Sequence, residues 1–124
     1  MSLDLSQSSW AVAAYYRVWT ALPYTRKGLM GVGVYALSES GRRRFSEFPN
    51  IIADDGYVRV LFRPHERAVV DHARSVVTAP KTLGGLIKIK TRSRLGAYQL
   101  ARRFPELMVN DDKDYAAALK DVAL

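Results

Sequence analysis

The fold of this chain is decided by residues 48–62, which read Phe48-Pro49-Asn50-Ile51-Ile52-Ala53-Asp54-Asp55-Gly56-Tyr57-Val58-Arg59-Val60-Leu61-Phe62. Two adjacent carboxylates follow an apolar run and open a segment in which apolar residues recur three and four positions apart. This spacing predicts a helix from Asp54 to Phe62, with the acidic doublet at or near its N-cap. Two interpretations of the doublet stay open: a helix cap, or a carboxylate held at the mouth of a site as a general base.

Length and composition predict a single domain over residues 1–124. About half of the residues are hydrophobic, which is enough to form a packed core. The absence of cysteine excludes disulfides and thiolate sites. Because no apolar run approaches the length of a membrane span and no secretory signal pattern occurs, we expect a cytoplasmic protein, with peripheral membrane contact as an option.

The formal charge of +7 favours an anionic partner, such as anionic lipid, nucleic acid or a phosphorylated small molecule. The basic residues gather in three groups, at 42–44, 88–94 and 102–103. Nucleic acid is the least favoured partner, because the aromatic residues concentrate in the first predicted helix and do not alternate with the basic stretches.

Periodicity and turn residues predict the other elements. A helix runs from Ser8 to Leu22 and stops at Pro23, and a buried strand covers Gly31–Leu37. Further along the chain we expect a short exposed helix or turn at 38–45, a strand or hairpin within 66–78, a helical region at 82–103 that is divided by a loop across 90–96 if its glycines break it, and a terminal helix at 115–122. The predicted class is α/β, with a short mixed sheet and flanking helices.

Read in order, these segments resemble the C-terminal half of a family 2 glycosyltransferase, from about Trp10 to Leu107. The run 31–38 resembles the strand that precedes the acceptor side of the site. The run 48–55 resembles the family's acidic doublet, usually Glu-Asp, whose second member is the catalytic base. Thr91-Arg92-Ser93-Arg94-Leu95 resembles the later Gln-Arg-x-Arg-Trp element, with Thr91 for Gln and Leu95 for Trp.

The resemblance implies a partial glycosyltransferase-A-like fold and an inverting transfer of sugar from a nucleotide-sugar donor to an acceptor hydroxyl. It implies that Asp55 is the base, with Asp54 beside it. The implied substrate-binding residues are Gly31, Gly33, Lys90, Arg92 and Arg94. The arginines would stabilise the negative charge that develops on the departing nucleoside diphosphate.

The family's nucleotide-binding half does not precede Trp10, so we expect a fragment or a truncated relative. That half carries an Asp-x-Asp for a divalent cation, Mg²⁺ or Mn²⁺. A cation is therefore expected for a complete enzyme and no cofactor for this chain alone. The alternative function is a non-enzymatic basic module that contacts phosphate-bearing partners. A half-fold that persists as a homo-oligomer, through uncovered apolar surface, is the third interpretation.

Overall fold

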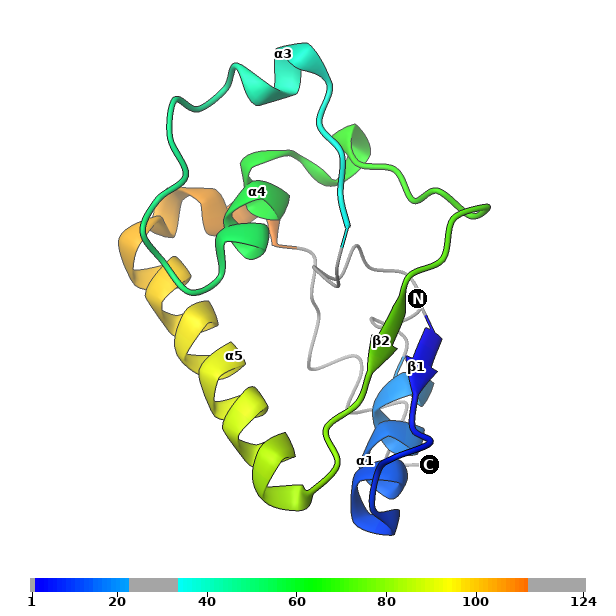
Figure 1. Ribbon diagram of the computed structural model, residues 1–124. Helices are drawn as coiled ribbons and strands as arrows, with labels where there is room; N and C mark the ends of the chain where they lie inside the picture. Colours follow the sequence, from blue (N-terminus) through cyan, green and yellow to red (C-terminus); the bar gives the residue numbers. More distant parts are fainter. Residues whose placement is uncertain (1, 23–33, 112–124) are drawn as a thin grey trace.

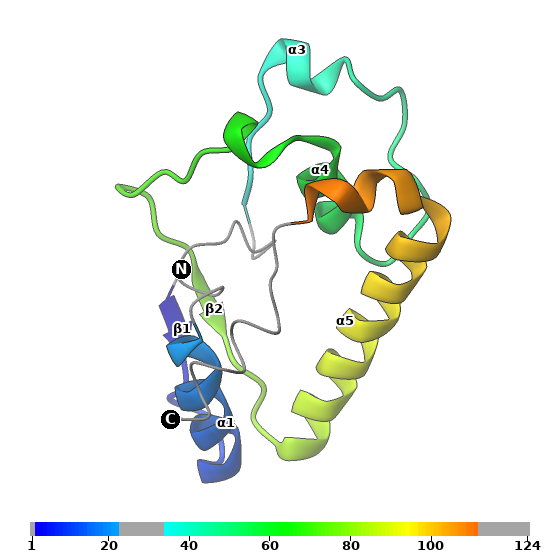
Figure 2. The ribbon, with the colours of Figure 1, turned by 180° about the vertical axis from the view of Figure 1, so that it is seen from behind.

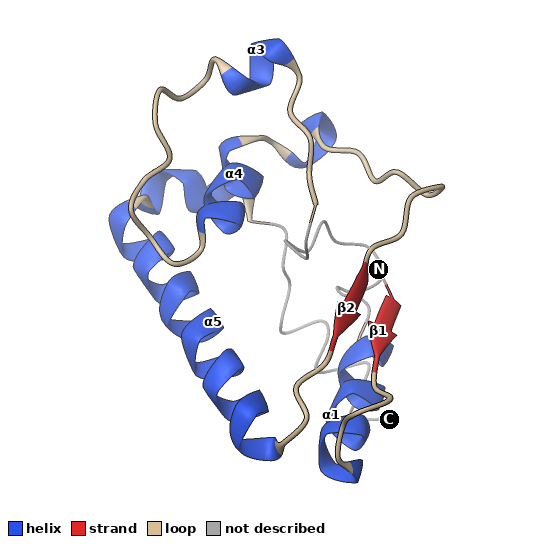
Figure 3. Ribbon diagram, viewed as in Figure 1, coloured by secondary structure: helices blue, strands red, loops and turns tan. Residues whose placement is uncertain are grey.

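The computed structural model describes residues 2–22 and 34–111 (Figure 1). The chain is mixed α/β, mostly helical, with one small parallel sheet (Figure 3). In chain order its elements are β1 (Ser2–Asp4), α1 (Trp10–Ala21), α3 (Glu39–Arg42), α4 (Asp54–Leu61), the 3₁₀ turn η1 (Pro64–Glu66), β2 (Val76–Thr78), α5 (Leu83–Arg103) and the 3₁₀ segment η2 (Pro105–Asn110).

Helix α5 is continuous over 21 residues and runs along one edge of the molecule in both opposite views (Figures 1 and 2). Thr82 begins it, because its hydroxyl accepts a hydrogen bond from the amide of Gly85 at 3.1 Å. Pro105 follows its end. The loop considered across 90–96 does not form. Gly96 is buried against Ile52 and Ala53, and this tertiary contact offsets the weak helix propensity of glycine.

The helix predicted to begin at the acidic doublet is confirmed as α4, ending one residue early at Leu61. Ala53 occupies the N-cap position, so both aspartates lie in the first turn. Three side chains, of Tyr57, Val58 and Val60, are buried on its inner face. The following Arg63-Pro64 ends the helix, as the sequence predicts.

The predicted helix at 8–22 is confirmed as α1, and the short helix at 38–45 as α3, whose cap is the Ser38 hydroxyl. The two histidines, His65 and His72, are both exposed. The terminal helix predicted at 115–122 lies outside the described residues.

The sheet differs from the prediction. β1 pairs with β2 in parallel, with Ser2 opposite Val76, so the described sheet is parallel and not mixed. The predicted strand at 31–37 is wrong over its described part: residues 34–37 are irregular, and Val34 is 86% exposed. Among described residues no strand pairs with residues 34–37, and these apolar side chains therefore stay largely exposed. Within 66–78 only Val76–Thr78 is a strand, and no hairpin forms there.

Within residues 2–22 and 34–111, two separate groups of buried residues form the core. The α4 cluster consists of Phe45, Tyr57, Val58, Val60 and Leu100. The α1 cluster consists of Val12, Tyr16, Ala79 and Leu86. Helix α5 contributes to both, through side chains that lie about 21 Å apart along its axis.

Candidate functional site

The acidic doublet lies at the open end of α4. One carboxylate oxygen of Asp54 accepts the amide of Asp55 at 3.0 Å, and one of Asp55 accepts the amide of Gly56 at 2.7 Å. Asp54 is exposed and Asp55 is half-buried. Neither takes part in the three ion pairs formed within residues 2–22 and 34–111. Both carboxylates are therefore accessible and not neutralised by a contacting cation in that part of the chain.

One face of α5 follows the segment that leads into the doublet. The Arg103 guanidinium donates to the carbonyl of Asn50 at 2.9 Å. One turn earlier, the Gln99 side-chain oxygen accepts the amide of Ile52 at 2.8 Å. One turn earlier again, a Cβ on Gly96 would lie only 3.2 Å from that of Ala53.

These contacts form a regular row. As the α5 residue number falls from 103 through 99 to 96, its partner advances from 50 through 52 to 53. The next residue on this helical face is Arg92, since positions 92, 96, 99 and 103 repeat at helical spacing. Arg92 therefore lies on the face of α5 that contacts residues 50–53, but it forms no ion pair with Asp54 or Asp55. Its guanidinium is exposed, as is the doublet's outer carboxylate.

Arg94 and Lys90 lie on other faces of α5. Successive helical residues are rotated by about 100°, so Arg94 is on the side of the helix opposite Arg92. Lys90 faces α1, where its ammonium nitrogen lies 4.5 Å from the ring centroid of Trp19 and within 5.6 Å of two tyrosine rings. Burial lowers the pKa of Lys90. The structure thus brings Asp54 and Asp55 together and places Arg92, but not Lys90 or Arg94, on the α5 face that contacts the segment before them. Gly31 and Gly33 lie outside the described residues.

Tyr35 is a site residue that sequence reasoning missed. Burial raises the pKa of its phenol, and the charges of Asp54 and Asp55 raise it further. This electrostatic coupling indicates that the Tyr35 phenol lies near the doublet. About half of its side chain is accessible. Its sequence signal is its position in the run 31–37, whose apolar character predicts a buried strand and gives Tyr35 no separate role.

The opposite end of α4 is fixed by polar contacts. Arg59 donates to the Asp111 carboxylate at 2.7 Å, and the Asn110 amide donates to the carbonyl of Val60 at 2.9 Å. The Arg67 guanidinium bridges the carbonyls of Phe62 and Asn110. These contacts hold the C-terminal end of α4 against η2, so its N-terminal end carries the doublet on a rigid support.

The described residues contain no group of three or more His, Cys, Asp or Glu side chains that could hold a metal ion. The two adjacent carboxylates of the doublet do not by themselves match the divalent cation site that the resemblance implies. Within the same residues, no helix combines the length and apolar character needed to cross a bilayer.

No protein-family model matches the chain, and no curated protein or solved structure is significantly similar to it. The assignment of a function therefore depends on the chain's own residues and contacts.

Proposed function

We propose that this chain forms the acceptor and catalytic-base side of a nucleotide-sugar-dependent glycosyltransferase with a partial glycosyltransferase-A-like fold. The observation that supports the proposal is that Arg92 belongs to the face of α5 whose residues 96, 99 and 103 contact the segment leading into the acidic doublet. An inverting transfer needs a base beside the acceptor and a cation beside the leaving group. The doublet and Arg92 supply these two charges from two helices that pack together.

In this mechanism Asp55 is the general base. It accepts the proton of an acceptor hydroxyl while that oxygen forms a bond to the anomeric carbon of the donor sugar. The bond between the anomeric carbon and the diphosphate oxygen breaks, and the diphosphate leaves with the electron pair. Asp55 suits this role because it is half-buried and bonded only through one oxygen to a local amide among described residues, so its other oxygen can face a ligand.

Arg92 stabilises the diphosphate. A guanidinium presents several N–H donors in a planar fork that matches phosphate oxygens. Arg92 lies on the face of α5 that contacts residues 50–53, whereas Arg94 lies on the opposite face. Of the two arginines of the sequence motif, the proposal therefore assigns the donor contact to Arg92.

The test measures release of nucleoside diphosphate from a panel of uridine, guanosine and thymidine diphosphate sugars with hydroxyl acceptors and a divalent cation. Asp55→Asn keeps the side-chain shape but removes the base, so transfer should fall by roughly 10²–10⁴-fold. Asp54→Asn should cost less, because it acts by orientation or charge. Asp71→Asn, at an exposed position outside the site, is the control and should leave transfer unchanged.

Binding separates the arginines. Arg92→Gln should weaken binding of the free nucleoside diphosphate in calorimetric titration, and Arg94→Gln should not. The proposal is overturned if wild-type protein turns over none of the donors, or if Asp55→Asn retains near-native transfer.

A further inference from the structure

The outward side of α5 combines exposed apolar and basic residues, of which Arg102 donates to the Tyr98 hydroxyl at 3.3 Å. The outer face consists of the exposed residues Leu83, Ile87, Lys88, Arg94, Leu95, Tyr98 and Arg102. At about 100° per residue, these seven positions fall within a sector of roughly 140°. Leu86, Gly96 and Leu100, which are buried, lie on the other side of the helix.

The exposure on this face is large for apolar side chains. Ile87 is 58% exposed, Leu95 55% and Tyr98 62%. These side chains occur on a helix whose inner side is already packed against both core clusters. The outer face is therefore an apolar surface left open by a helix that is held in place, and not the frayed side of a loose helix.

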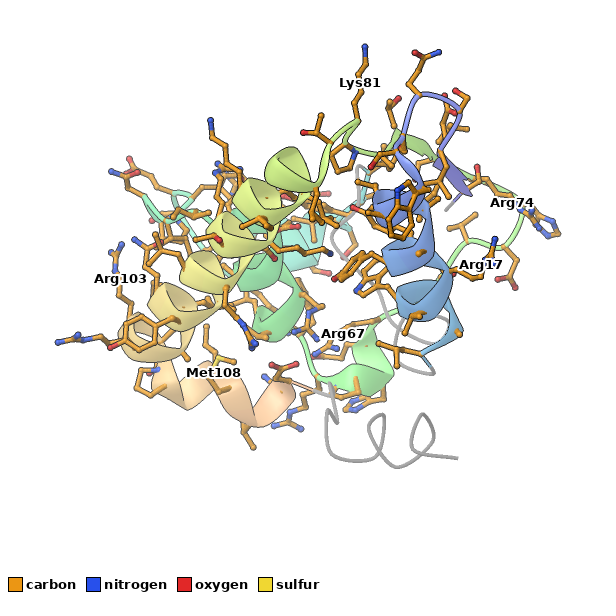
Figure 4. All side chains as sticks on the ribbon, turned by 90° about the horizontal axis from the view of Figure 1, so that it is seen from below. Arg17, Arg67, Arg74, Lys81, Arg103 and Met108 are labelled. Carbon is orange, nitrogen blue, oxygen red and sulfur yellow. The ribbon has the colours of Figure 1, made fainter. Side chains whose placement is uncertain are left out.

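The charge of α5 is of one sign. Residues 83–103 contain six lysines and arginines and no aspartate or glutamate. Three of the six, Lys88, Arg94 and Arg102, belong to the outer face and are exposed. Lys81 adds a further charge just before the first turn of the helix, while Arg103 at the other end belongs to the row and donates to the Asn50 carbonyl (Figure 4). A partner of this face must be both anionic and able to accept aliphatic side chains.

We propose that the outer face of α5 docks on the surface of an anionic lipid bilayer. Phospholipid headgroups pair with the basic residues, while Ile87, Leu95 and Tyr98 enter the boundary with the acyl chains. The flexible stems of Lys88 and Arg94 let their charges reach the headgroup layer. Between Leu83 and Arg102 the face extends about 28 Å along the helix, so α5 would lie parallel to the bilayer plane.

Two other partners fit less well. Nucleic acid would meet the charges, but it offers stacking surfaces for aromatic rings and nothing comparable for Ile87 and Leu95. A second copy of the chain would bring two faces of the same positive sign together. The proposal does not depend on the glycosyltransferase proposal, because most of the outer face, including Ile87, Arg94 and Tyr98, lies on the side of α5 away from Arg92, and only Lys88 borders the row.

The test is sedimentation of the full chain with vesicles of phosphatidylcholine, with and without 30% phosphatidylglycerol. We expect binding to the anionic vesicles that falls as salt rises. Each basic residue near the surface contributes about fivefold to partitioning, so Lys88→Gln/Arg94→Gln should weaken it about 25-fold. The control pair Arg17→Gln/Arg74→Gln removes the same charge from exposed positions outside α5 and should have little effect.

A second comparison tests the apolar contribution. Ile87→Ser should weaken vesicle binding severalfold, whereas Val70→Ser, at a similarly exposed valine, should not. Equal losses in variant and control would overturn the proposal in favour of net charge alone. Tighter binding to a short RNA or DNA duplex than to anionic vesicles would overturn it in favour of nucleic acid. A dimer in light scattering that Ile87→Ser dissociates would identify a second copy as the occupant.

Discussion

The two core clusters share one helix but are held to it by different forces. Around the α4 cluster, backbone and side-chain hydrogen bonds join α5 to residues 50–52, and the Arg59–Asp111 ion pair joins α4 to η2. Around the α1 cluster, the polar group that faces α1 from α5 is Lys90, whose ammonium lies against the rings of Tyr15, Tyr16 and Trp19. The α4 end is directional and polar, and the α1 end is apolar and aromatic.

The two ends of α5 therefore differ in how precisely their contacts fix the position of the helix. Hydrogen bonds between fixed groups define the register of α5 against the doublet to within the tolerance of a hydrogen bond. Packing of rings around a flexible lysine is less directional and tolerates small shifts. The candidate site lies at the end where the register is defined, as a reaction that needs positioned charges would require.

The largest expected effect comes from the close contact of α5 with the doublet segment. In Gly96→Val the new Cβ would meet Ile52 at 3.1 Å and the backbone nitrogen of Ala53 at 3.3 Å. Overpacking at such a site costs about 1–3 kcal/mol, so the melting temperature should fall by several degrees or more. The control is Gly84→Val, where a Cβ meets nothing within 4 Å and the melting temperature should hold or rise. Equal melting temperatures would show that the register at Gly96 is not fixed.

A smaller effect is expected at the α1 end. Lys90→Met keeps most of the apolar stem and removes the ammonium, losing a cation–π attraction of roughly 0.5–1 kcal/mol. Burial offsets part of this attraction, since it disfavours the charged amine and lowers its pKa. Thermal unfolding should show a slight loss of stability, with faster hydrogen exchange in α1, and Lys88→Met should show neither. A higher melting temperature in Lys90→Met would mean that desolvation outweighs the ring contacts.

The smallest expected effect on stability comes from an ion pair beside the α4 cluster, and it depends on pH. Arg44 donates to both carboxylate oxygens of Glu66 and lies over the ring of Phe62. The Arg44 hydrogen bonds, together with an amide of Arg63, lower the pKa of Glu66 to about 2. Because the unfolded carboxylate binds a proton near pH 4.5 and the folded one only near 2, this contribution is present above pH 4.5 and is lost as pH falls toward 2.

The pair is partly exposed, so its contribution is modest and salt-sensitive. Melting temperatures of wild type and Glu66→Gln at pH 2.5, 4.5 and 7 test it. The variant should show less loss of stability between pH 4.5 and 2.5. If the melting temperatures of the two proteins change equally with pH, the Arg44–Glu66 pair does not contribute to stability.

The helices could be predicted from the sequence because amphipathic spacing and stop signals act within a few residues. Asp54–Leu61 and Trp10–Ala21 are examples, each with apolar repeats and a proline just beyond. The continuity of α5 could not be predicted, because the propensity cost of Gly96 is offset by a contact with residues more than forty positions away. The strand expected at 31–37 failed over its described part for a related reason: an apolar run becomes a strand only when another strand pairs with it.

The candidate site was predictable in its residue types and less so in its grouping. The sequence predicts Asp54, Asp55 and Arg92 as site residues, and Arg92 lies on the α5 face that contacts residues 50–53. The family resemblance implies Lys90 and Arg94 together with Arg92, but helical rotation places these three side chains on different faces of α5. Tyr35 was missed because its relation to the doublet is tertiary.

The parallel pairing of β1 with β2 has a consequence for the order in which the molecule folds. Ser2 can meet Val76 only after the intervening chain has been brought back on itself, and the entropic cost of closing a loop grows with its length. Helix α5, by contrast, forms from bonds between residues four apart. We therefore expect the sheet to close last. Pulse-labelling hydrogen exchange tests this order, because the amide of Ala79, bonded to Asp4, should gain protection after that of Phe104, bonded to Leu100. The reverse order would make the terminal strand an early nucleus of folding.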